Sequence, residues 1–367
     1  MSIRLVLLGG LLLGAMASGR GQTPMFNQRV SDSDPLRAEQ AKELQDYIHA
    51  MAADKTRLAA LFRPDYSSPQ AFVSSARRLK QRFAESIGYP PPGDPVTEKP
   101  TFTQMGEDAI GTYYRARIPI LPGVNAEGIY IVPKNRKSRV PLIISMHGGG
   151  GSPEVALFNG GSNYHDMVRG GVKLGYAVFA PQHLFSAQGY PGDIRTKTDS
   201  DLRLVGTSLT AIEIAKITRS LDVLLKRPEI DAKRVAMVGL SYGGYYALVT
   251  PALDPRIKVS VSSCYFGVQE YRYERHEFNG VSDFAFADRF SLLRDPEIAA
   301  LICPRPLMIQ AGKSDDDPHR AMGVRLAPSV ADYYQKLGKG DDFRFELFNG
   351  GHEFDDASAW AFIKAHL

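Results

Sequence analysis

A serine flanked by glycines follows an apolar run in the middle of the chain. The sequence GLSYGG occupies residues 239–244, after an apolar run at 235–238 and before a helical pattern at 245–252. A strand, a tight turn and a helix in this order expose the serine hydroxyl, and the glycines are needed because side chains in such a turn would collide with neighbouring backbone. We therefore predict that Ser241 is a nucleophile in covalent catalysis. The alternative is a glycine-rich turn that merely contains a serine.

A serine hydroxyl at its ordinary pKa needs a neighbouring base to become a good nucleophile. The chain has eight histidines, and His352 stands out because it ends the sequence NGGH at residues 349–352. This segment follows an apolar run at 343–348 and precedes a helical pattern near Trp360 and Ile363, so it is predicted to be a loop at the end of a strand. The glycines would let the loop approach the serine. We predict His352 as the general base, against the alternative of a surface histidine.

A carboxylate that orients the histidine is expected between the serine and the histidine in the sequence. The segment LMIQAGKSD at residues 307–315 is a predicted buried strand that ends in a loop with a carboxylate. Asp315 has the spacing G-x-x-D, and Asp316 and Asp317 follow it directly. We predict Asp315 as the orienting acid, with Asp317 in reserve. The three carboxylates could also form a solvated turn or a calcium site.

Acyl transfer also needs hydrogen-bond donors for the oxyanion that develops on the substrate carbonyl. One predicted donor is the backbone N–H of Tyr242, directly after the serine. The other is Gly149, in the sequence HGGGG at residues 147–151 that follows an apolar run at 142–146. His147 at the root of this loop is predicted to border the substrate and support the loop, not to act as a catalyst.

No cofactor is expected. The His, Cys, Asp and Glu residues show no metal-ligand spacing, and no G-x-x-x-x-G-K-[ST] motif is present. The glycines at 148–151 lack the following helix and the ribose-binding acid of a dinucleotide site. The formal net charge of +4 and the lack of a long Lys/Arg run argue against nucleic acid as a partner.

The first residues have the pattern of a signal peptide. Arg4 is followed by an apolar stretch at 5–17, which ends in the small-x-small sequence Ala-Met-Ala. We predict that residues 1–17 are a signal peptide and that the protein is secreted or periplasmic. The alternative, a membrane anchor, would need about 20 apolar residues. In an oxidising compartment Cys264 and Cys303 could form a disulfide, but their apolar neighbours are equally compatible with two buried thiols.

Helical patterns recur between residues 31 and 88. Ala41, Leu44, Ile48 and Met51 recur at helical spacing after Asp34-Pro35. A second stripe lies between Ser68-Pro69 and Gly88 and contains Phe72, Ala76, Leu79, Phe83 and Ile87. The proline-rich sequence at 89–95 can be neither helix interior nor central strand. We predict a helical extension over 31–95 that packs on a catalytic domain over 96–367.

Short β-rich runs alternate with helical patterns in that second part. The predicted strands are 114–120, 128–132, 141–146, 176–180, 235–240, 258–262, 307–311 and 343–348. The clearest helix is at 208–226, with Ile214, Ile217, Leu221 and Leu224 on one face. Alternation of helices with nearly continuous Val/Ile/Leu strands predicts an α/β fold with a mainly parallel central sheet covered by helices on both faces.

A long insert separates two predicted strands, between residues 263 and 307. It contains the aromatic residues Tyr265, Phe266, Tyr271, Tyr273, Phe278, Phe284, Phe286 and Phe290. Segments that leave the carboxyl ends of parallel strands lie where ligands bind. We predict that Tyr265 and Phe266 contact the substrate. The alternative is that these aromatics only pack the insert onto the sheet.

These motifs, in the order Ser, Asp, His, resemble the α/β-hydrolase superfamily over roughly residues 113–367. The sequence ICPRPL at 302–307, and PGV at 122–124 leading into GIYIVP at 128–133, are similar to dienelactone-hydrolase-like and acetyl xylan esterase-like bacterial enzymes. The resemblance implies the α/β-hydrolase fold and a carboxylic ester hydrolase. Dienelactone hydrolases proper use a cysteine nucleophile, whereas this chain has Ser241, so their lactone chemistry is not implied.

The expected function is an exported serine esterase that removes acetyl or similar small acyl groups from small-molecule or polysaccharide esters through an acyl-enzyme. One alternative is a peptidase, because G-x-S-Y-G-G also resembles the prolyl-oligopeptidase type. Only about 90 residues stand where those enzymes carry a propeller, too few to form one. Another alternative is a non-catalytic binding module on a hydrolase scaffold.

Overall fold

The computed structural model describes residues 25–134, 136, 138–160, 162–184, 194–275 and 282–367. The predicted signal peptide at 1–17 lies outside these residues. The chain divides into two compact units, Met1–Met51 and Ala52–Leu367. In the first unit a 3-10 turn (Val30–Ser33) leads into helix α1 (Asp34–Ala53), which confirms the first predicted helix. Among the described residues, no helix is both long and apolar enough to cross a membrane.

The second predicted helical stripe forms two helices. They are α3 (Pro69–Ser75) and α4 (Arg77–Ile87), preceded by α2 (Lys55–Leu61). The Ser68 side chain caps α3, and the chain leaves α4 through Gly88 at φ +69°, a conformation that favours glycine. Ala76 separates the two helices, so the helical pattern between Ser68-Pro69 and Gly88 is interrupted at one residue. The stripe is nevertheless buried in the core, because Phe72, Leu79 and Phe83 are fully covered.

Nine strands form one sheet in the described part of the chain. They are β1 (Thr101–Glu107), β2 (Gly111–Leu121), β3 (Val124–Pro133), β4 (Val140–Met146), β5 (Ala177–Pro181), β6 (Ile230–Leu240), β7 (Val259–Ser263), β8 (Leu307–Gly312) and β9 (Phe343–Phe348). Their order is β1-β2-β3-β5-β4-β6-β7-β8-β9. The pairs β1·β2, β2·β3 and β3·β5 are antiparallel, and every pair from β5 to β9 is parallel.

The sequence predicts all of these strands except β1. The residues of β1, TFTQMGE, are almost all exposed, because β1 is an edge strand in which only Phe102 is partly buried against the core. Such a strand lacks the apolar run or alternation that reveals the others. The prediction of a mainly parallel sheet is confirmed.

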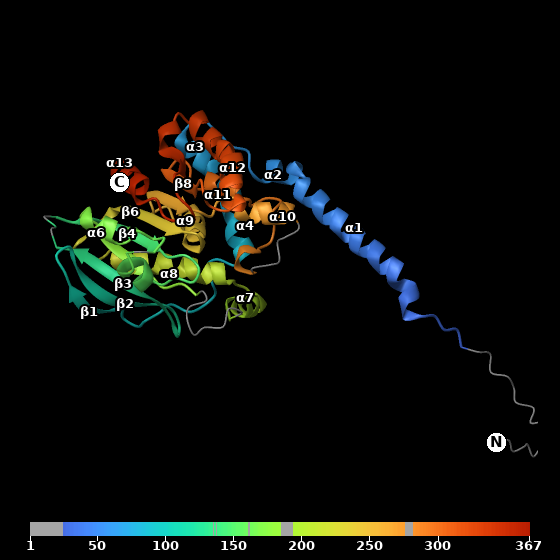
Figure 1. Cartoon of the computed structure of the whole chain (residues 1–367), viewed down its shortest axis with the longest axis horizontal. Coiled ribbons are helices and arrows are strands. Elements are labelled where there is room, and N and C mark those ends of the chain that lie inside the picture. The colour runs from blue at the N-terminus through green and yellow to red at the C-terminus, as the bar shows by residue number, and fades with distance from the viewer. Residues whose placement is uncertain (1–24, 135, 137, 161, 185–193, 276–281) are drawn as a thin grey trace, which may run out of the picture. The chain divides into compact units, whose positions relative to one another are not determined.

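Helices cover both faces of the sheet (Figure 1). On one face lie α4, α8 (Leu209–Leu224), α9 (Tyr242–Leu253) and α11 (Asp295–Ala300), and on the other lie α5 (Pro153–Phe158), α6 (Arg169–Lys173) and α13 (Asp356–His366). The strands alternate accordingly, since Ile144 and Met237 belong to the first apolar layer and Ile143 and Val238 to the second. The helices predicted to cover the sheet are therefore present on both sides.

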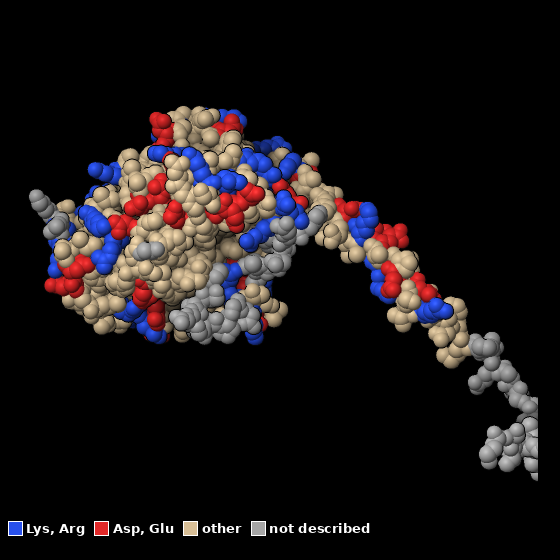
Figure 2. Space-filling model, viewed as in Figure 1, with Lys and Arg blue, Asp and Glu red and all other residues tan. Residues whose placement is uncertain are grey.

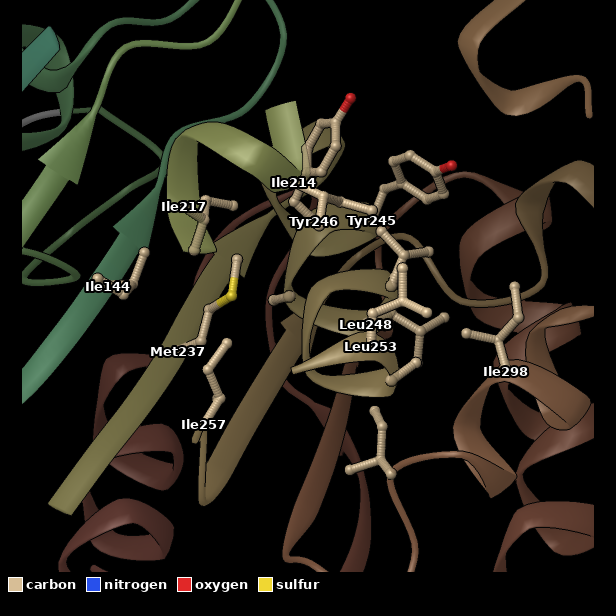
Figure 3. Close-up of a cluster of buried hydrophobic side chains, with 14 of the residues drawn as sticks. Ile144, Ile214, Ile217, Met237, Tyr245, Tyr246, Leu248, Leu253, Ile257 and Ile298 are labelled. Atoms are coloured by element: carbon tan, nitrogen blue, oxygen red, sulfur yellow. The ribbon is translucent and has the colours of Figure 1, made fainter. Parts of the chain in front are cut away.

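Figure 3 shows the first layer close up, with side chains of α8 and α9 packed over strands β4 and β6. The predicted apolar face of α8 is buried throughout, and Ser208 caps the helix by accepting the N–H of Ala211. The proline-rich segment after Gly88 forms neither helix nor strand. Figure 2 shows one face of the unit Ala52–Leu367, on which Lys and Arg side chains are interspersed with Asp and Glu.

The remaining elements lie between the strands or follow them. They are α7 (Ile194–Leu204), α10 (Val268–Glu274), a 3-10 turn at Ser282–Phe284, α12 (Asp317–Lys336) and a 3-10 turn at Gly340–Asp342. The loops that follow the parallel strands β4, β6, β7, β8 and β9 leave the same edge of the sheet, because parallel strands end together. These loops contain the residues that were predicted to carry chemistry.

Candidate active site

Ser241 is the single residue between strand β6 and helix α9. Its backbone has φ +58° and ψ −117°, a conformation that L side chains rarely adopt and that needs support from the surroundings. Hydrogen bonds of both backbone groups of Ser241 provide this support. The N–H of Ser241 donates to the carbonyl of Ser263 on β7 at 2.8 Å, and its carbonyl accepts the N–H of Tyr245 at 3.0 Å.

The glycines around Ser241 are required by close backbone contacts. A Cβ atom on Gly239 would lie 2.1 Å from the carbonyl oxygen of Gly243, and one on Gly243 would lie 2.1 Å from that of Met146. Both distances are far below van der Waals contact, and backbone atoms cannot move aside as a flexible side chain could. The tight turn predicted from GLSYGG is therefore present, and its glycines are there for the predicted reason.

His352 lies on the loop between β9 and α13 and pairs with Asp315 on the loop after β8. Its Nδ1 lies 2.9 Å from Oδ2 and 3.1 Å from Oδ1 of Asp315. Burial alone would raise the pKa of Asp315, but the His352 hydrogen bond and the neighbouring histidines hold it below its ordinary value. With Nδ1 donating to this carboxylate, Nε2 of His352 is left as the basic nitrogen.

The two carboxylates next to Asp315 have other partners. The side chain of Asp316 is largely exposed and contacts His319, and that of Asp317 is largely exposed and pairs with Arg320. Asp315, by contrast, has a side chain only 3% exposed. Of the three adjacent candidates, the structure brings Asp315 to His352.

A second histidine, His319 on α12, lies beside this pair. Its ring packs edge-on against the ring of His352, with the centroids 4.6 Å apart. Its Nδ1 lies 3.5 Å from Oδ1 of Asp315 and contacts Asp316. His319 was not predicted from the sequence, although its position four residues after Asp315, at the start of a helix, was the available signal.

A pocket of about 200 Å³ opens beside Ser241. It is lined by Gly149, Arg195, Ser241, Tyr242, Cys264, Tyr265, Val268, Gln269, Arg272, Phe284 and His319. Tyr265 lines this pocket, and its contact with the substrate stays a prediction. Phe266 does not line this pocket, because it is 1% exposed and packs in the apolar layer with α9. The two arginines were not predicted, since no motif surrounds either of them.

The other aromatic residues of the insert divide between the pocket and packing. Phe284 lines the pocket, whereas Phe286 packs against Phe83 of α4, and Tyr273 stacks on Phe290. Phe278 lies outside the described residues. The insert therefore supplies part of the pocket wall, and its other aromatic residues pack onto the helices.

The two predicted oxyanion donors both border the pocket. Tyr242 is the first residue of α9, so its N–H has no acceptor within the helix. Gly149 is in the loop after β4, and this loop lies against the serine, since a Cβ on Gly148 would be 3.3 Å from the Cβ of Ser241. The hydroxyl of Tyr164 accepts the N–H of Gly148 at 2.9 Å and so fixes the loop.

His147 lies beneath this loop and does not line the pocket. Its ring is buried, stacks on the ring of His183 at 3.7 Å and has Nδ1 2.9 Å from the carbonyl oxygen of Gly148. Burial lowers the pKa of His147 to about 4, so the ring is neutral near pH 7. The structure thus gives His147 the position of a loop support and does not bring it to the pocket surface. His183, which completes the stack, was missed by sequence analysis.

A buried carboxylate connects the insert to the residue after the serine. The Tyr242 hydroxyl donates to Oδ2 of Asp283 at 2.5 Å, and Nη2 of Arg195 lies 3.3 Å from the other oxygen. Burial raises the pKa of Asp283 to about 6, against the opposing effects of Arg195 and Tyr242. This network fixes Tyr242 and Arg195, both of which line the pocket.

Both cysteines are buried free thiols, so the alternative of two buried thiols is the one found. Cys264 follows β7 and lines the pocket, with Sγ 3.4 Å from the carbonyl oxygen of Glu353. Burial and the nearby charge of Asp315 raise the pKa of the Cys264 thiol. This thiol is therefore neutral and a poor nucleophile.

The ligand atoms of Asp315, Asp316 and His319 lie within 4.8 Å of one another, as do those of Cys264, Asp315 and His352. Among the described residues, these are the two groups of three side chains that could hold a metal ion. Asp315 belongs to both groups and is already hydrogen-bonded to His352. That the protein needs no metal or other cofactor stays a prediction from the sequence.

Comparison with known proteins gives a consistent result. The model of the dienelactone hydrolase family matches residues 127–357. The YtaP protein of Bacillus subtilis (strain 168) is 27% identical over 244 residues, which cover 62% of this chain and 78% of that protein. A glucuronoyl esterase from Solibacter usitatus superimposes with a TM-score of 0.63 at 14% identity, over 84% of this chain and 97% of that chain.

An acetyl xylan esterase from Paenibacillus sp. R4 superimposes with a TM-score of 0.53 at 17% identity, over 86% of this chain and 100% of that chain. At these identities the solved structures show a shared fold and nothing further. The predicted α/β-hydrolase fold is confirmed.

Proposed function

The chain belongs to the dienelactone hydrolase family, as its resemblance predicted, and we propose that it is a serine hydrolase that cleaves carboxylic esters through an acyl-enzyme on Ser241. One observation carries the proposal. The hydrogen bond from His352 to the buried Asp315 carboxylate lies beside the pocket that contains Ser241 in its strained turn. Nucleophile, base and orienting acid in this arrangement are what acyl transfer requires.

In the proposed reaction Nε2 of His352 takes the proton from Ser241 as Oγ attacks the ester carbonyl. Asp315 stabilises the imidazolium that forms and keeps the proton of the neutral ring on Nδ1. The carbonyl oxygen becomes an oxyanion, which accepts hydrogen bonds from the N–H groups of Gly149 and Tyr242. The N-terminus of α9 adds a positive potential at the same point.

Collapse of the tetrahedral intermediate breaks the bond to the leaving oxygen, which receives the proton from His352. A water molecule then attacks the acyl-enzyme carbonyl, with His352 again as the base, and releases the acid and free Ser241. The neutral, buried thiol of Cys264 takes no part in these steps.

For the substrate we propose acetyl or other small acyl esters of carbohydrates. The pocket of about 200 Å³ supports a small acyl group. The printed names of the structural relatives, an acetyl xylan esterase and a glucuronoyl esterase, favour a carbohydrate on the other side of the ester. Export, proposed from the signal-peptide pattern at 1–17, would bring the enzyme to such substrates outside the cell.

The proposal is tested by hydrolysis of p-nitrophenyl acetate with the Ser241→Ala variant. Loss of the nucleophile is expected to lower kcat by up to ~10⁶-fold. Ser74→Ala is a matched control, because Ser74 is an exposed serine on α3. Turnover by Ser241→Ala within tenfold of the unmodified chain would rule out the proposed mechanism. A panel of acetylated xylan, glucuronoyl and feruloyl esters would then identify the preferred acyl and alcohol parts.

A further inference from the structure

One face of helix α10 borders the pocket beside Ser241. Val268, Gln269 and Arg272 of this helix line the pocket, together with Tyr265 just before it. Positions 265, 268, 269 and 272 have the spacing of a single helical face, so these side chains approach the pocket from one side. Three of the four can form hydrogen bonds, and none of those three takes part in the steps proposed at Ser241.

Two of these side chains have buried polar atoms without a hydrogen bond. Tyr265 is 3% exposed and Gln269 is 2% exposed. Neither the Tyr265 hydroxyl nor Oε1 of Gln269 has a hydrogen-bond partner in the described part of the chain. Buried polar groups are almost always hydrogen-bonded, because a bond left unmade costs free energy. Two such groups beside one pocket therefore indicate that a polar ligand completes their hydrogen bonds.

The lining of the pocket also carries positive charge. It contains Arg195 and Arg272 and, among its described residues, no Asp or Glu. His319 lines it as well, but burial lowers the pKa of His319, so this ring adds no charge near pH 7. Arg195 faces the buried carboxylate of Asp283 and lies over the Tyr242 ring, 4.8 Å from its centroid. The charge of Arg195 is therefore offset within the protein.

Arg272 has no such counter-charge among the residues that the structure describes. The two acids of its own helix are engaged elsewhere. Glu270 pairs with Arg289 at 3.0 Å, and Glu274 pairs with Arg325. Arg272 is partly buried at the pocket, where a guanidinium attracts an anion and can hold a carboxylate through two parallel N–H···O bonds.

We propose that this face of α10 is a subsite for a carboxylate on the substrate, a few bonds away from the ester that Ser241 attacks. Arg272 binds the carboxylate. After small rotations of their side chains, the Tyr265 hydroxyl donates to the same carboxylate and Oε1 of Gln269 accepts from a neighbouring substrate hydroxyl. The inference rests on the proposed function and narrows its substrate class to esters with an acidic group beside the bond that is cleaved.

Two pairs of substrates test the subsite and identify which side of the ester carries the charge. For the acyl side, monomethyl succinate is compared with methyl 4-methylpentanoate, which has the same shape without the charge. For the alcohol side, acetylated glucuronic acid is compared with acetylated glucose. In one of the pairs, kcat/KM at pH 7 should be at least tenfold higher for the acidic member. Equal values, or a preference for the neutral member, in both pairs overturn the proposal.

Substitutions of Arg272 then show whether the preference depends on this residue. Arg272→Gln removes the charge, so the preference for the acidic member should fall roughly tenfold. Arg272→Lys keeps the charge without the guanidinium fork and should retain part of the preference. Arg117→Gln is the matched control, because Arg117 on β2 is exposed and pairs with Glu127. A preference that survives in full in Arg272→Gln overturns the proposal.

Binding can also be measured without turnover. Ligand-observed saturation-transfer NMR on the full-length Ser241→Ala chain follows monomethyl succinate and acetylated glucuronic acid, with and without Arg272→Gln. We expect one of these acids to bind and the second substitution to weaken it. Such binding in a protein that hydrolyses no ester would contradict the proposed function and support the subsite. Hydrolysis of p-nitrophenyl acetate without any acidic preference would contradict the subsite and leave the proposed function intact.

Discussion

Nδ1 of His352 lies 2.9 Å from Oδ2 of Asp315, and this contact joins two loops that are 37 residues apart in the sequence. Both loops leave the sheet at the edge where β6 presents Ser241. A carboxylate in this position fixes the tautomer of the imidazole and stabilises its charged form.

Removing the charge of Asp315 should disable the base while leaving the fold intact. Asp315→Asn is expected to lower kcat by about 10⁴-fold, as such a change does in a serine protease with these three groups, because the imidazole is left in the wrong tautomer. Asp317→Asn is the matched control, since that carboxylate is exposed and pairs only with Arg320. Steady-state kinetics with p-nitrophenyl acetate and circular dichroism on both variants check this. If kcat fell equally in the two variants, Asp315 would not be the carboxylate that orients His352.

The loop that supplies Gly149 should depend on Tyr164. Tyr164→Phe removes the acceptor of the Gly148 N–H, and a donor left unsatisfied in a buried site costs about 1–3 kcal/mol. We expect kcat to fall by roughly tenfold with a smaller change in KM, because the proposed oxyanion donor Gly149 would act on the transition state. Tyr114→Phe, on β2, is the control. A variant with unchanged kcat would show that the loop keeps its position without this bond.

The glycines of the turn should tolerate no side chain. Gly243→Ala would place Cβ 2.1 Å from the Met146 carbonyl oxygen, so we expect a loss of at least ~3 kcal/mol in the free energy of unfolding or failure to fold. Gly160→Ala is the control, because a Cβ there meets nothing within 4 Å. Urea unfolding of both variants measures the difference. Similar stability of the two would mean that the turn can widen.

The pH dependence of stability should contain a contribution from Asp283. Its pKa is raised from 3.8 to about 6 by burial, so the folded state binds a proton that the unfolded state has lost between these values. The contribution of Asp283 to the free energy of unfolding is therefore fully present below about pH 4 and is lost as the pH rises through about 6. By linkage the loss is of the order of 3 kcal/mol.

Asp283→Asn removes this titration, so the variant's stability deficit relative to the unmodified chain should be larger at pH 4 than at pH 7. Urea unfolding at both pH values tests this, with Asp317→Asn as the exposed control. A deficit that grows with rising pH would contradict the sign of the shift.

Much of the site could be predicted from local sequence because local backbone geometry determines it. The turn at Ser241 requires its glycines, and apolar runs reveal the buried strands that carry the loops of Asp315 and His352. The G-x-x-D spacing favoured Asp315 among three adjacent aspartates, with Asp317 in reserve, but the contact that distinguishes Asp315 is not local. It depends on which side chain is buried against a histidine far away in the sequence.

Other residues of the site were predicted in the wrong place or not at all, because their positions depend on packing between segments far apart in the sequence. Phe266 and His147 were expected at the pocket, but Phe266 packs in the first apolar layer and His147 stacks on His183, which no local pattern shows. Arg195, Arg272 and His319 come from three separate helices and meet only in the folded chain. The edge strand β1 was missed because it buries almost nothing.

The most direct test of the central claim is covalent capture of the nucleophile. The folded full-length protein is treated with a fluorophosphonate, digested and mapped by mass spectrometry, alongside the Ser241→Ala and Asp315→Asn variants. We expect one adduct per chain on Ser241 that accumulates together with loss of esterase activity, no adduct in Ser241→Ala and slow labelling in Asp315→Asn. An unlabelled Ser241 in an active protein, or an adduct on another residue, would contradict the assignment of Ser241 as the nucleophile.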